Sequence, residues 1–172
     1  MNHVSQSPLM SPFTVVVDTR EQMPYEFAAI HADAAQHRRL IHVPREVRCL
    51  SSGDYSIAGE FESRVAVERK SLADLFSTLG QGRKRFTAEL ERLAAYDFAA
   101  VVVEATWEMV LGDPPPRSEL NPKTIYRSVI AWQVRYPRVH WWMCPNRAFA
   151  EVTTYRILER FWKERENKKG EK

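Results

Sequence analysis

The sequence has few cysteines and no long apolar run. Its 172 residues include two cysteines, Cys49 and Cys144, far apart and without a second cysteine or histidine at zinc-ligand spacing. This excludes a disulfide-stapled secreted scaffold and a zinc module. No apolar run reaches the roughly 18 residues of a membrane span, and the N-terminus lacks the basic-then-apolar order of a signal peptide. We therefore expect a cytoplasmic protein, or a nuclear one in a eukaryote.

A strong excess of charge of either sign is also missing. Lys and Arg number 25 against 22 Asp and Glu, which gives a formal net charge of +3. This balance permits a nucleic-acid partner but does not require one. Hydrophobic residues make up 44% of the chain, and the length suits one domain with a sizeable core.

The pattern along the chain predicts a single α/β domain. We expect residues 1–12 to form a flexible tail, residues 13–163 the folded domain and residues 164–172 a charged C-terminal tail. Apolar runs of strand length alternate with helix-spaced ones, which is typical of a mixed sheet flanked by helices. The expected strands are 13–17, 41–50, 55–58, 64–70, 98–103 and 139–143, the second to fourth forming a meander. The expected helices are 31–40, 72–79, 83–95, 122–136 and 147–163.

Charged residues gather at the ends of these predicted strands. Four of them are acidic: Asp18, Asp54, Glu68 and Glu104. Lys70 follows Glu68 by two positions, and side chains two apart in a strand point to the same face. We therefore expect a carboxylate and an ammonium to project together beside the turn that carries Asp54.

This set of groups suits hydrolysis of a phosphodiester bond. Carboxylates hold hard cations such as Mg²⁺ or Mn²⁺, which polarise a phosphate and lower the pKa of a bound water. A nearby lysine can orient the water or offset charge developing on the phosphate. An aspartate followed after a gap by Glu-x-Lys is the signature of PD-(D/E)xK nucleases. The same spacing also fits an exposed salt bridge worth about 0–1 kcal/mol, and Glu104 suits a strand-end charge as well as a metal ligand.

Two longer motifs resemble the nuclease domain of the XPF family of structure-specific endonucleases. The family's G-D…E-R-K-x-x-x-D signature is complete in Gly53-Asp54 and Glu68–Asp74, and its V-D-x-R-E motif matches Val17–Glu21. The resemblance covers about residues 13–160. It implies a restriction-endonuclease-like fold, in which helices flank a mixed central sheet.

The resemblance also implies roles for individual residues. Asp54 and Glu68 would be ligands of Mg²⁺ or Mn²⁺, Lys70 the catalytic lysine, and Asp18 a further acidic ligand, direct or through water. The supporting residues would be Arg20, Glu21, Arg69 and Asp74. For two of these a structural interpretation stays open, because Asp74 suits a helix start and Arg69 a bridge to Glu21 or Asp74.

Contact with the DNA backbone would come from the basic start of the helix predicted at 83–95. Arg83, Lys84 and Arg85 lie there, where backbone N–H groups also favour phosphate, although such a cluster equally suits a solvated face. Many family members carry a tandem helix-hairpin-helix domain after the nuclease, and this sequence shows none. We therefore expect weak, strongly salt-dependent DNA binding by the isolated chain.

The function implied is a metal-dependent endonuclease that cuts branched, flap or fork DNA, as in repair and recombination. The main alternative is a catalytically silent scaffold that binds DNA or pairs with an active subunit, since some family members have lost cleavage. The intact acidic residues and lysine argue against that alternative. A sequence-specific nuclease or nickase with the same chemistry is a third interpretation.

Family nuclease domains pair through their late helices, which implies a homodimer here. The last predicted helix carries apolar residues around most of its circumference, which suits either a helix sunk in its own core or one that also forms an interface. We expect the interface to involve residues 125–136 and 147–163. Phe161 and Trp162 are the best candidates for the side that faces the partner.

Overall fold

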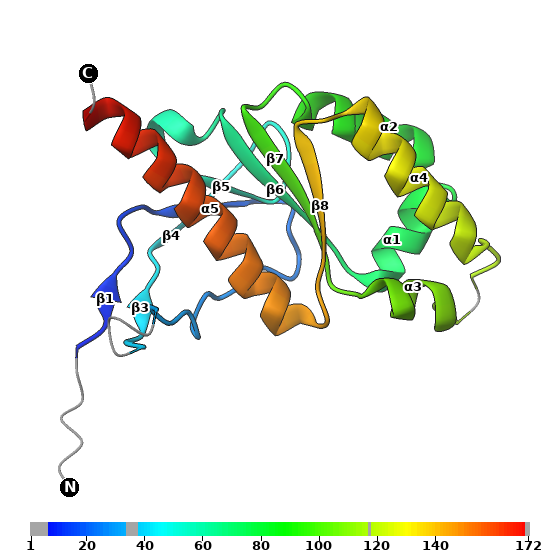
Figure 1. The fold of residues 1–172 in the computed structure, drawn as a ribbon, viewed down its shortest axis with the longest axis horizontal. Helices are drawn as coiled ribbons and strands as arrows, with labels where there is room; N and C mark the ends of the chain where they lie inside the picture. The colour runs from blue at the N-terminus through cyan, green and yellow to red at the C-terminus, as the bar shows by residue number, and fades with distance from the viewer. Residues whose placement is uncertain (1–6, 34–37, 117, 171–172) are drawn as a thin grey trace, which may run out of the picture.

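A mixed six-stranded sheet forms the centre of the fold (Figure 1). The computed structural model describes residues 7–33, 38–116 and 118–170. The strand order is β4-β2-β5-β6-β7-β8, and a separate two-stranded sheet pairs β1 with β3. The strands are β1 (Leu9–Met10), β2 (Val15–Asp18), β3 (Ile41–His42), β4 (Arg45–Arg48), β5 (Tyr55–Ile57), β6 (Val65–Lys70), β7 (Phe98–Val103) and β8 (Val139–Met143).

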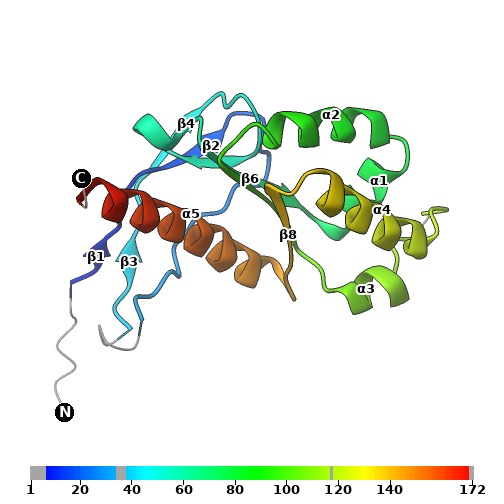
Figure 2. The same ribbon diagram turned by 45° about the horizontal axis from the view of Figure 1, so that its top comes forward.

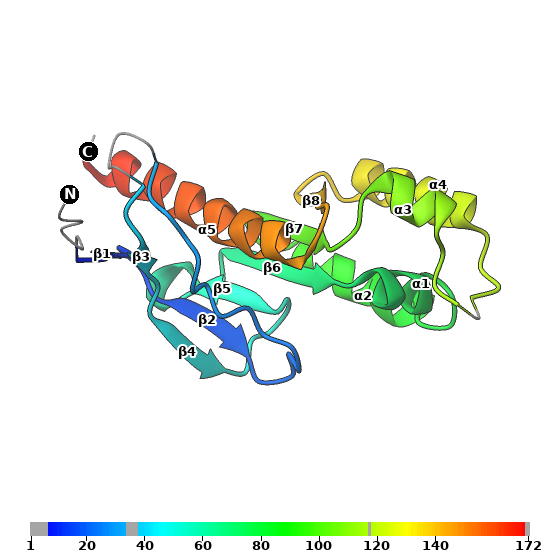
Figure 3. The ribbon, with the colours of Figure 1, turned by 90° about the horizontal axis from the view of Figure 1, so that it is seen from below.

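Helices cover both faces of this sheet, which confirms the predicted α/β class. One face is crossed by α5 (Arg147–Gly170), as Figure 3 shows. The other helices gather toward the opposite end of the molecule (Figure 2): α1 (Leu72–Leu79), α2 (Arg83–Leu93), α3 (Trp107–Gly112) and α4 (Pro122–Arg135). Within the described ranges, no helix is both long enough and apolar enough to cross a lipid bilayer.

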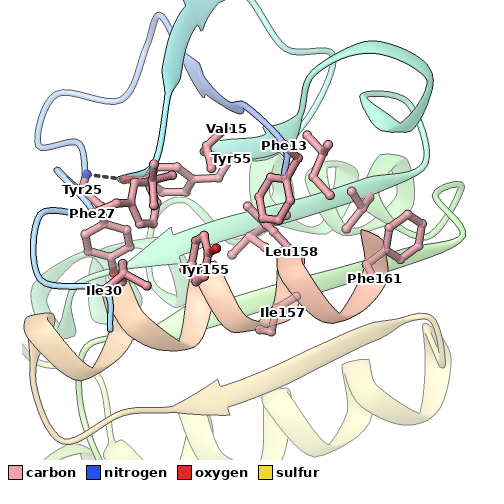
Figure 4. Close-up of a cluster of buried hydrophobic side chains, with 14 of the residues drawn as sticks. Phe13, Val15, Tyr25, Phe27, Ile30, Tyr55, Tyr155, Ile157, Leu158 and Phe161 are labelled. Atoms are coloured by element: carbon pink, nitrogen blue, oxygen red, sulfur yellow. Dashed lines mark hydrogen bonds between the residues drawn. The ribbon is translucent and has the colours of Figure 1, made fainter. Parts of the chain in front are cut away.

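The sheet separates two hydrophobic cores, and β6 contributes to both because its side chains alternate. Val65 and Val67 join the core under α5, whereas Ala66 joins the core under α1, α2 and α4. Figure 4 shows part of the first core, where Tyr155 and Leu158 point from α5 toward the sheet. Continuing the alternation, Glu68 and Lys70 lie on the α2 side and Arg69 on the α5 side.

The strand order corrects the predicted meander. β5 and β6 pair as expected in antiparallel fashion, but β2 lies between β4 and β5, parallel to β4 and antiparallel to β5. All four residues of β2 are buried and all four of β4 are exposed. The apolar β2 therefore lies inside the sheet, and the charged β4 forms its edge. Pro44 lies between β3 and β4, where the predicted strand 41–50 is interrupted.

The predicted ends of the domain differ from the observed ones. Residues 1–6 of the expected tail lie outside the described residues, but Leu9–Met10 form β1, and α5 continues to Gly170 through most of the expected charged tail. The helix expected at 31–40 also lies partly outside them. Its first and last positions, His31 and Leu40, face each other in a β-bridge instead.

The two residues expected to face a partner lie against the domain's own core, so that prediction was wrong. Phe161 is 8% exposed and meets Phe61 edge-on, with 5.8 Å between ring centres. Trp162 lies 6.3 Å from the ring of Phe13. Phe13 and Phe61 are far apart in sequence, and burying both rings requires the C-terminal half of α5 to cover them.

Candidate active site

Four charged residues predicted for the site share one face of the sheet. They are Asp18 from β2, Asp54 from the turn before β5, and Glu68 and Lys70 from β6, and these strands are adjacent. The four line a cleft of about 340 Å³, whose opposite wall comes from α1 and α2. The predicted set of catalytic side chains is therefore brought together.

The turn that carries Asp54 requires glycine at position 53. Gly53 has a φ of +78°, and a Cβ there would lie 3.1 Å from Ala66 Cβ and 3.2 Å from the Val67 carbonyl oxygen. Asp54 is then held from both sides, since its N–H donates to Val67 O at 2.8 Å and its carbonyl accepts from Asp18 N at 2.8 Å. The close approach permitted by Gly53 places Asp54 beside the end of β6.

Lys70 is held by a carboxylate and an aromatic ring. Its Nζ lies 2.5 Å from Glu68 Oε1 and 4.9 Å from the centre of the Phe86 ring on α2. Burial opposes the charge on the ammonium, but the adjacent Glu68 outweighs burial and raises the pKa of Lys70. Lys70 is therefore a fixed cation at neutral pH, suited to stabilising negative charge and unsuited to accepting a proton.

Two of the acids in the cleft, Asp54 and Glu68, are poorly neutralised. Burial raises the pKa of Asp54 well above its ordinary value of 3.8, and repulsion by Glu68 raises it further. Burial likewise raises the pKa of Glu68, although Lys70 acts in the opposite direction. Two neighbouring carboxylates that share one lysine repel each other when both are ionised, and a bound cation would relieve this repulsion.

Asp18 lines the same cleft but is occupied by other partners. Its Oδ1 accepts from the backbone N–H and Nε of Arg20, at 2.8 and 2.7 Å, and its Oδ2 from Arg20 Nη2 and the Leu50 amide, at 2.9 and 2.7 Å. Burial opposes the charge of Asp18, but these donors lower its pKa. Asp18 thus holds Arg20 at the rim of the cleft, and its role as a metal ligand stays a prediction.

Arg69, Glu21 and Glu104 lie on the α5 face of the sheet, outside the cleft. Arg69 donates to Glu104 through Nε at 2.7 Å and Nη2 at 3.0 Å, and its Nη1 lies 3.4 Å from Glu21. Glu104 also accepts from Tyr25 and Arg147. Of the two interpretations left open for Arg69, the bridge to Glu21 is present. Glu104 is the centre of an ion network on the face opposite Asp54 and Glu68.

The remaining predicted residues divide between structural and cleft positions. Asp74 accepts from Ser71 Oγ at 2.6 Å in the first turn of α1, as a helix-start residue does. Arg83 donates to Ser128 Oγ at 2.8 Å and lies over the Trp132 ring, so it links α2 to α4. Arg85 lines the cleft, and Lys84 is exposed outside it.

Of the α2 residues that line the cleft, three were not predicted: Phe86 as a contact of Lys70, together with Glu89 and Arg92. Their spacing of three places them on one side of α2. That spacing is visible in the sequence, but it does not reveal which side of the helix faces the strand ends. The packing of α2 on the sheet decides this.

The carboxylates of the cleft suit a hard divalent cation. Asp54 Oδ2 accepts from Arg69 N at 2.7 Å and Glu68 Oε1 pairs with Lys70, while the second oxygen of each acid has no hydrogen-bond donor in the described structure. The atoms of Asp54 and Glu68 that could bind a metal are all oxygens, which favours Mg²⁺ or Mn²⁺ over softer metals. Among the described residues, no group of three or more Asp, Glu, His or Cys side chains forms a complete metal site. Asp54 and Glu68 would therefore share a cation with water or substrate oxygens.

Comparison with known proteins supports this fold and family. No curated protein matches the chain. Two solved structures of XPF from Aeropyrum pernix do, one of them in complex with DNA, both with a TM-score of 0.58 and with 21% and 22% identity. The matches cover 86% and 88% of this chain but 58% and 66% of the archaeal chains, so this chain spans about three fifths of their length. The ERCC4 domain model matches residues 17–155. This match takes in the strands and helices that build the cleft, and the chain belongs to the ERCC4 domain family.

Proposed function

We propose that this chain is a Mg²⁺- or Mn²⁺-dependent endonuclease that cuts branched, flap or fork DNA. The observation that carries the proposal is a pair of under-neutralised carboxylates, Asp54 and Glu68, beside a fixed lysine in a cleft of about 340 Å³. The membership of the chain in the ERCC4 domain family supports nuclease chemistry. The likeness of its fold to that of an archaeal XPF in complex with DNA supports DNA as the substrate.

Several residues of the cleft have distinct tasks in this proposal. Asp54 and Glu68 would hold the cation, which when bound supplies Lewis-acid activation of phosphate and water. Lys70, kept protonated by Glu68, would offset the charge that develops on the phosphate. Arg20 and Arg85, at the rim, would contact neighbouring phosphates of the bound strand. Phe86, whose ring centre lies 4.9 Å from Lys70 Nζ, would help to orient the ammonium group.

Cleavage of labelled DNA tests the proposal. Flap, fork, gapped and linear duplex substrates would be incubated with the protein and Mg²⁺ or Mn²⁺, with EDTA and the Glu68→Gln variant as controls. We expect cleavage of the branched substrates that disappears with either control. Metal-independent cleavage, or equal cleavage by the variant, would contradict it, and DNA binding without cleavage would favour the scaffold.

We also propose that two copies of the chain associate through the side that carries β8, α4 and α5. A groove of about 700 Å³ runs between the edge strand β8 and α5. Its apolar residues include Trp142, Phe149 and Val152, which are 46%, 55% and 36% exposed. Exposed apolar patches of this kind mark association surfaces. A dimer would offer branched DNA two clefts, and the second contact would gain from effective concentration.

Light scattering at micromolar concentration tests the association. We expect a dimer for the unmodified chain and a folded monomer for the variant carrying both Phe149→Glu and Val152→Glu. Val47→Glu, at the opposite edge of the sheet where Val47 is 69% exposed, is the matched control and should remain dimeric. A monomeric unmodified chain would rule the association out without affecting the proposed chemistry.

A further inference from the structure

Two side chains of α2, Glu89 and Arg92, form hydrogen bonds with the turn that carries Asp54. Glu89 Oε1 accepts from Ser52 Oγ at 2.5 Å and from the Gly53 amide at 3.2 Å. Its Oε2 accepts from Arg92, whose Nε also approaches Ser52 Oγ at 3.4 Å. Glu89 lines the cleft with Asp54, and the proposed chemistry gives it no task.

The turn from Ser52 to Asp54 is fixed by three separate elements. The Asp54 amide donates to the Val67 carbonyl of β6, and the Asp54 carbonyl accepts from the Asp18 amide of β2. Glu89 of α2 accepts from the preceding amide, that of Gly53. Ser52 is 1% exposed and Gly53 is buried. Without Glu89, the buried Ser52 hydroxyl and the buried Gly53 amide would have no acceptor among the described residues. Buried donors seek a partner because leaving them unsatisfied is costly, so the turn would shift, and Asp54 would shift with it.

Glu89 keeps its negative charge in this environment. Burial opposes ionisation, but the hydrogen bonds from Ser52, Gly53 and Arg92 outweigh it and lower the pKa of Glu89. Ionised Glu89 therefore remains available as the acceptor that holds the Ser52–Gly53 peptide.

We infer that Glu89 is a positioning residue of the metal site: by holding the Ser52–Gly53 peptide it fixes the Asp54 carboxylate opposite Glu68 and thereby sets the affinity for the divalent cation. This inference rests on the proposed function only in assuming that Asp54 and Glu68 bind the cation. Groups that orient metal ligands in this way commonly change metal affinity by about 10–100-fold when they are replaced.

Calorimetric titration with Mn²⁺, in the absence of DNA, tests the inference. We expect Glu89→Ala to weaken Mn²⁺ binding by about 10–100-fold. Glu89→Gln retains an acceptor for Ser52 and Gly53 and should restore most of that affinity. The matched control is Glu91→Ala, which removes the same charge from an exposed position of α2 and should bind like the unmodified chain. In cleavage assays, Glu89→Ala should raise the half-saturating metal concentration far more than it lowers the rate at saturating metal.

The outcomes separate this inference from the proposed function. Equal Mn²⁺ affinity of the unmodified chain and Glu89→Ala would overturn the inference and leave the metal site intact. Glu89→Gln binding as weakly as Glu89→Ala would overturn positioning through the turn, because charge would then be the cause. If Glu89→Ala does not fold, Ser52→Ala, which removes one of the two donors, must still weaken Mn²⁺ binding. No Mn²⁺ binding by the unmodified chain would contradict the proposed function itself.

Discussion

The end of β6 carries two groups of charged side chains, one on each face of the sheet. The two groups differ in how many basic side chains accompany their carboxylates. On the α5 face, the carboxylates of Glu21 and Glu104 meet the guanidinium groups of Arg69 and Arg147, so charges balance. On the α2 face, Glu68 pairs with Lys70, and Asp54 has no ion pair among the described residues. Glu68, Arg69 and Lys70 are consecutive residues of one strand, so the two groups lie close together. They differ in the charged side chains that surround them. We call the α5 face balanced, because each of its carboxylates meets a guanidinium group, and the α2 face unbalanced, because Asp54 and Glu68 have one ammonium group between them.

The largest expected effect comes from removing the lysine of the unbalanced face. Lys70→Met should lower the rate of DNA cleavage about 10²–10³-fold, because charge developing on the phosphate would have no fixed counter-charge. Lys123→Met, at an exposed position of α4, is the matched control and should cleave normally. Single-turnover cleavage with circular dichroism as a check on folding would measure this. A folded Lys70→Met variant that cleaves at the normal rate would remove Lys70 from the chemistry.

Breaking the balanced face should cost stability instead. Arg69→Met leaves Glu104 and Glu21 without their shared partner, in surroundings where the side chains are 10%, 10% and 7% exposed for Arg69, Glu104 and Glu21. Breaking a buried pair in this way typically costs about 3–5 kcal/mol of unfolding free energy. Urea denaturation should detect it, whereas Arg160→Met, 76% exposed in its pair with Glu164, should cost under about 1 kcal/mol. Normal stability combined with an absence of Mn²⁺ binding would assign Arg69 to the metal site.

The unbalanced face also predicts a pH dependence of stability without metal. An acid whose folded-state pKa is raised binds more protons when folded, so stability falls as pH rises from its ordinary pKa, 3.8 for Asp54, to the raised folded value. Asp54→Asn removes this decline, and its melting temperature should exceed that of the unmodified chain by a margin that grows with pH. Mn²⁺ should close the gap by stabilising only the unmodified chain. A constant margin across pH, unaffected by Mn²⁺, would contradict the raised pKa.

The smallest expected effect concerns the basic residues of α2. Arg85 lines the cleft, so Arg85→Ala should weaken DNA binding and reduce the slope of log affinity against log salt by about 0.9 for each phosphate that Arg85 neutralises. Arg83→Ala should leave that slope unchanged and destabilise the domain, because Arg83 is committed to Ser128 and Trp132. Binding measured by fluorescence anisotropy at several salt concentrations separates the two. Equal salt slopes for the two variants would contradict the assignment of Arg85 to DNA contact and Arg83 to structure.

The central features of the site were predictable because they depend on local geometry. Side chains two apart in a strand share a face, so Glu68 and Lys70 had to project together wherever β6 lay. The need for glycine before Asp54 was not predicted, because part of it comes from the close approach of Ala66 and Val67 of β6. The last helix was also predicted, but the orientation of Phe161 and Trp162 was not, since apolar residues around a helix do not reveal which of them face the core.

The sequence by itself determined the α/β class, the strands that carry the acidic residues and the match of two motifs to the XPF family, because each depends on short-range periodicity and residue type. Only the tertiary structure decided which partners those residues meet. It placed β2 between β4 and β5, directed Arg69 to Glu104, joined Asp18 to the Leu50 amide and brought Glu89 of α2 to the Asp54 turn. Most of these contacts join segments tens of residues apart. They are selected by the packing of whole elements and by the requirement that buried charges and donors find partners, which no local pattern encodes.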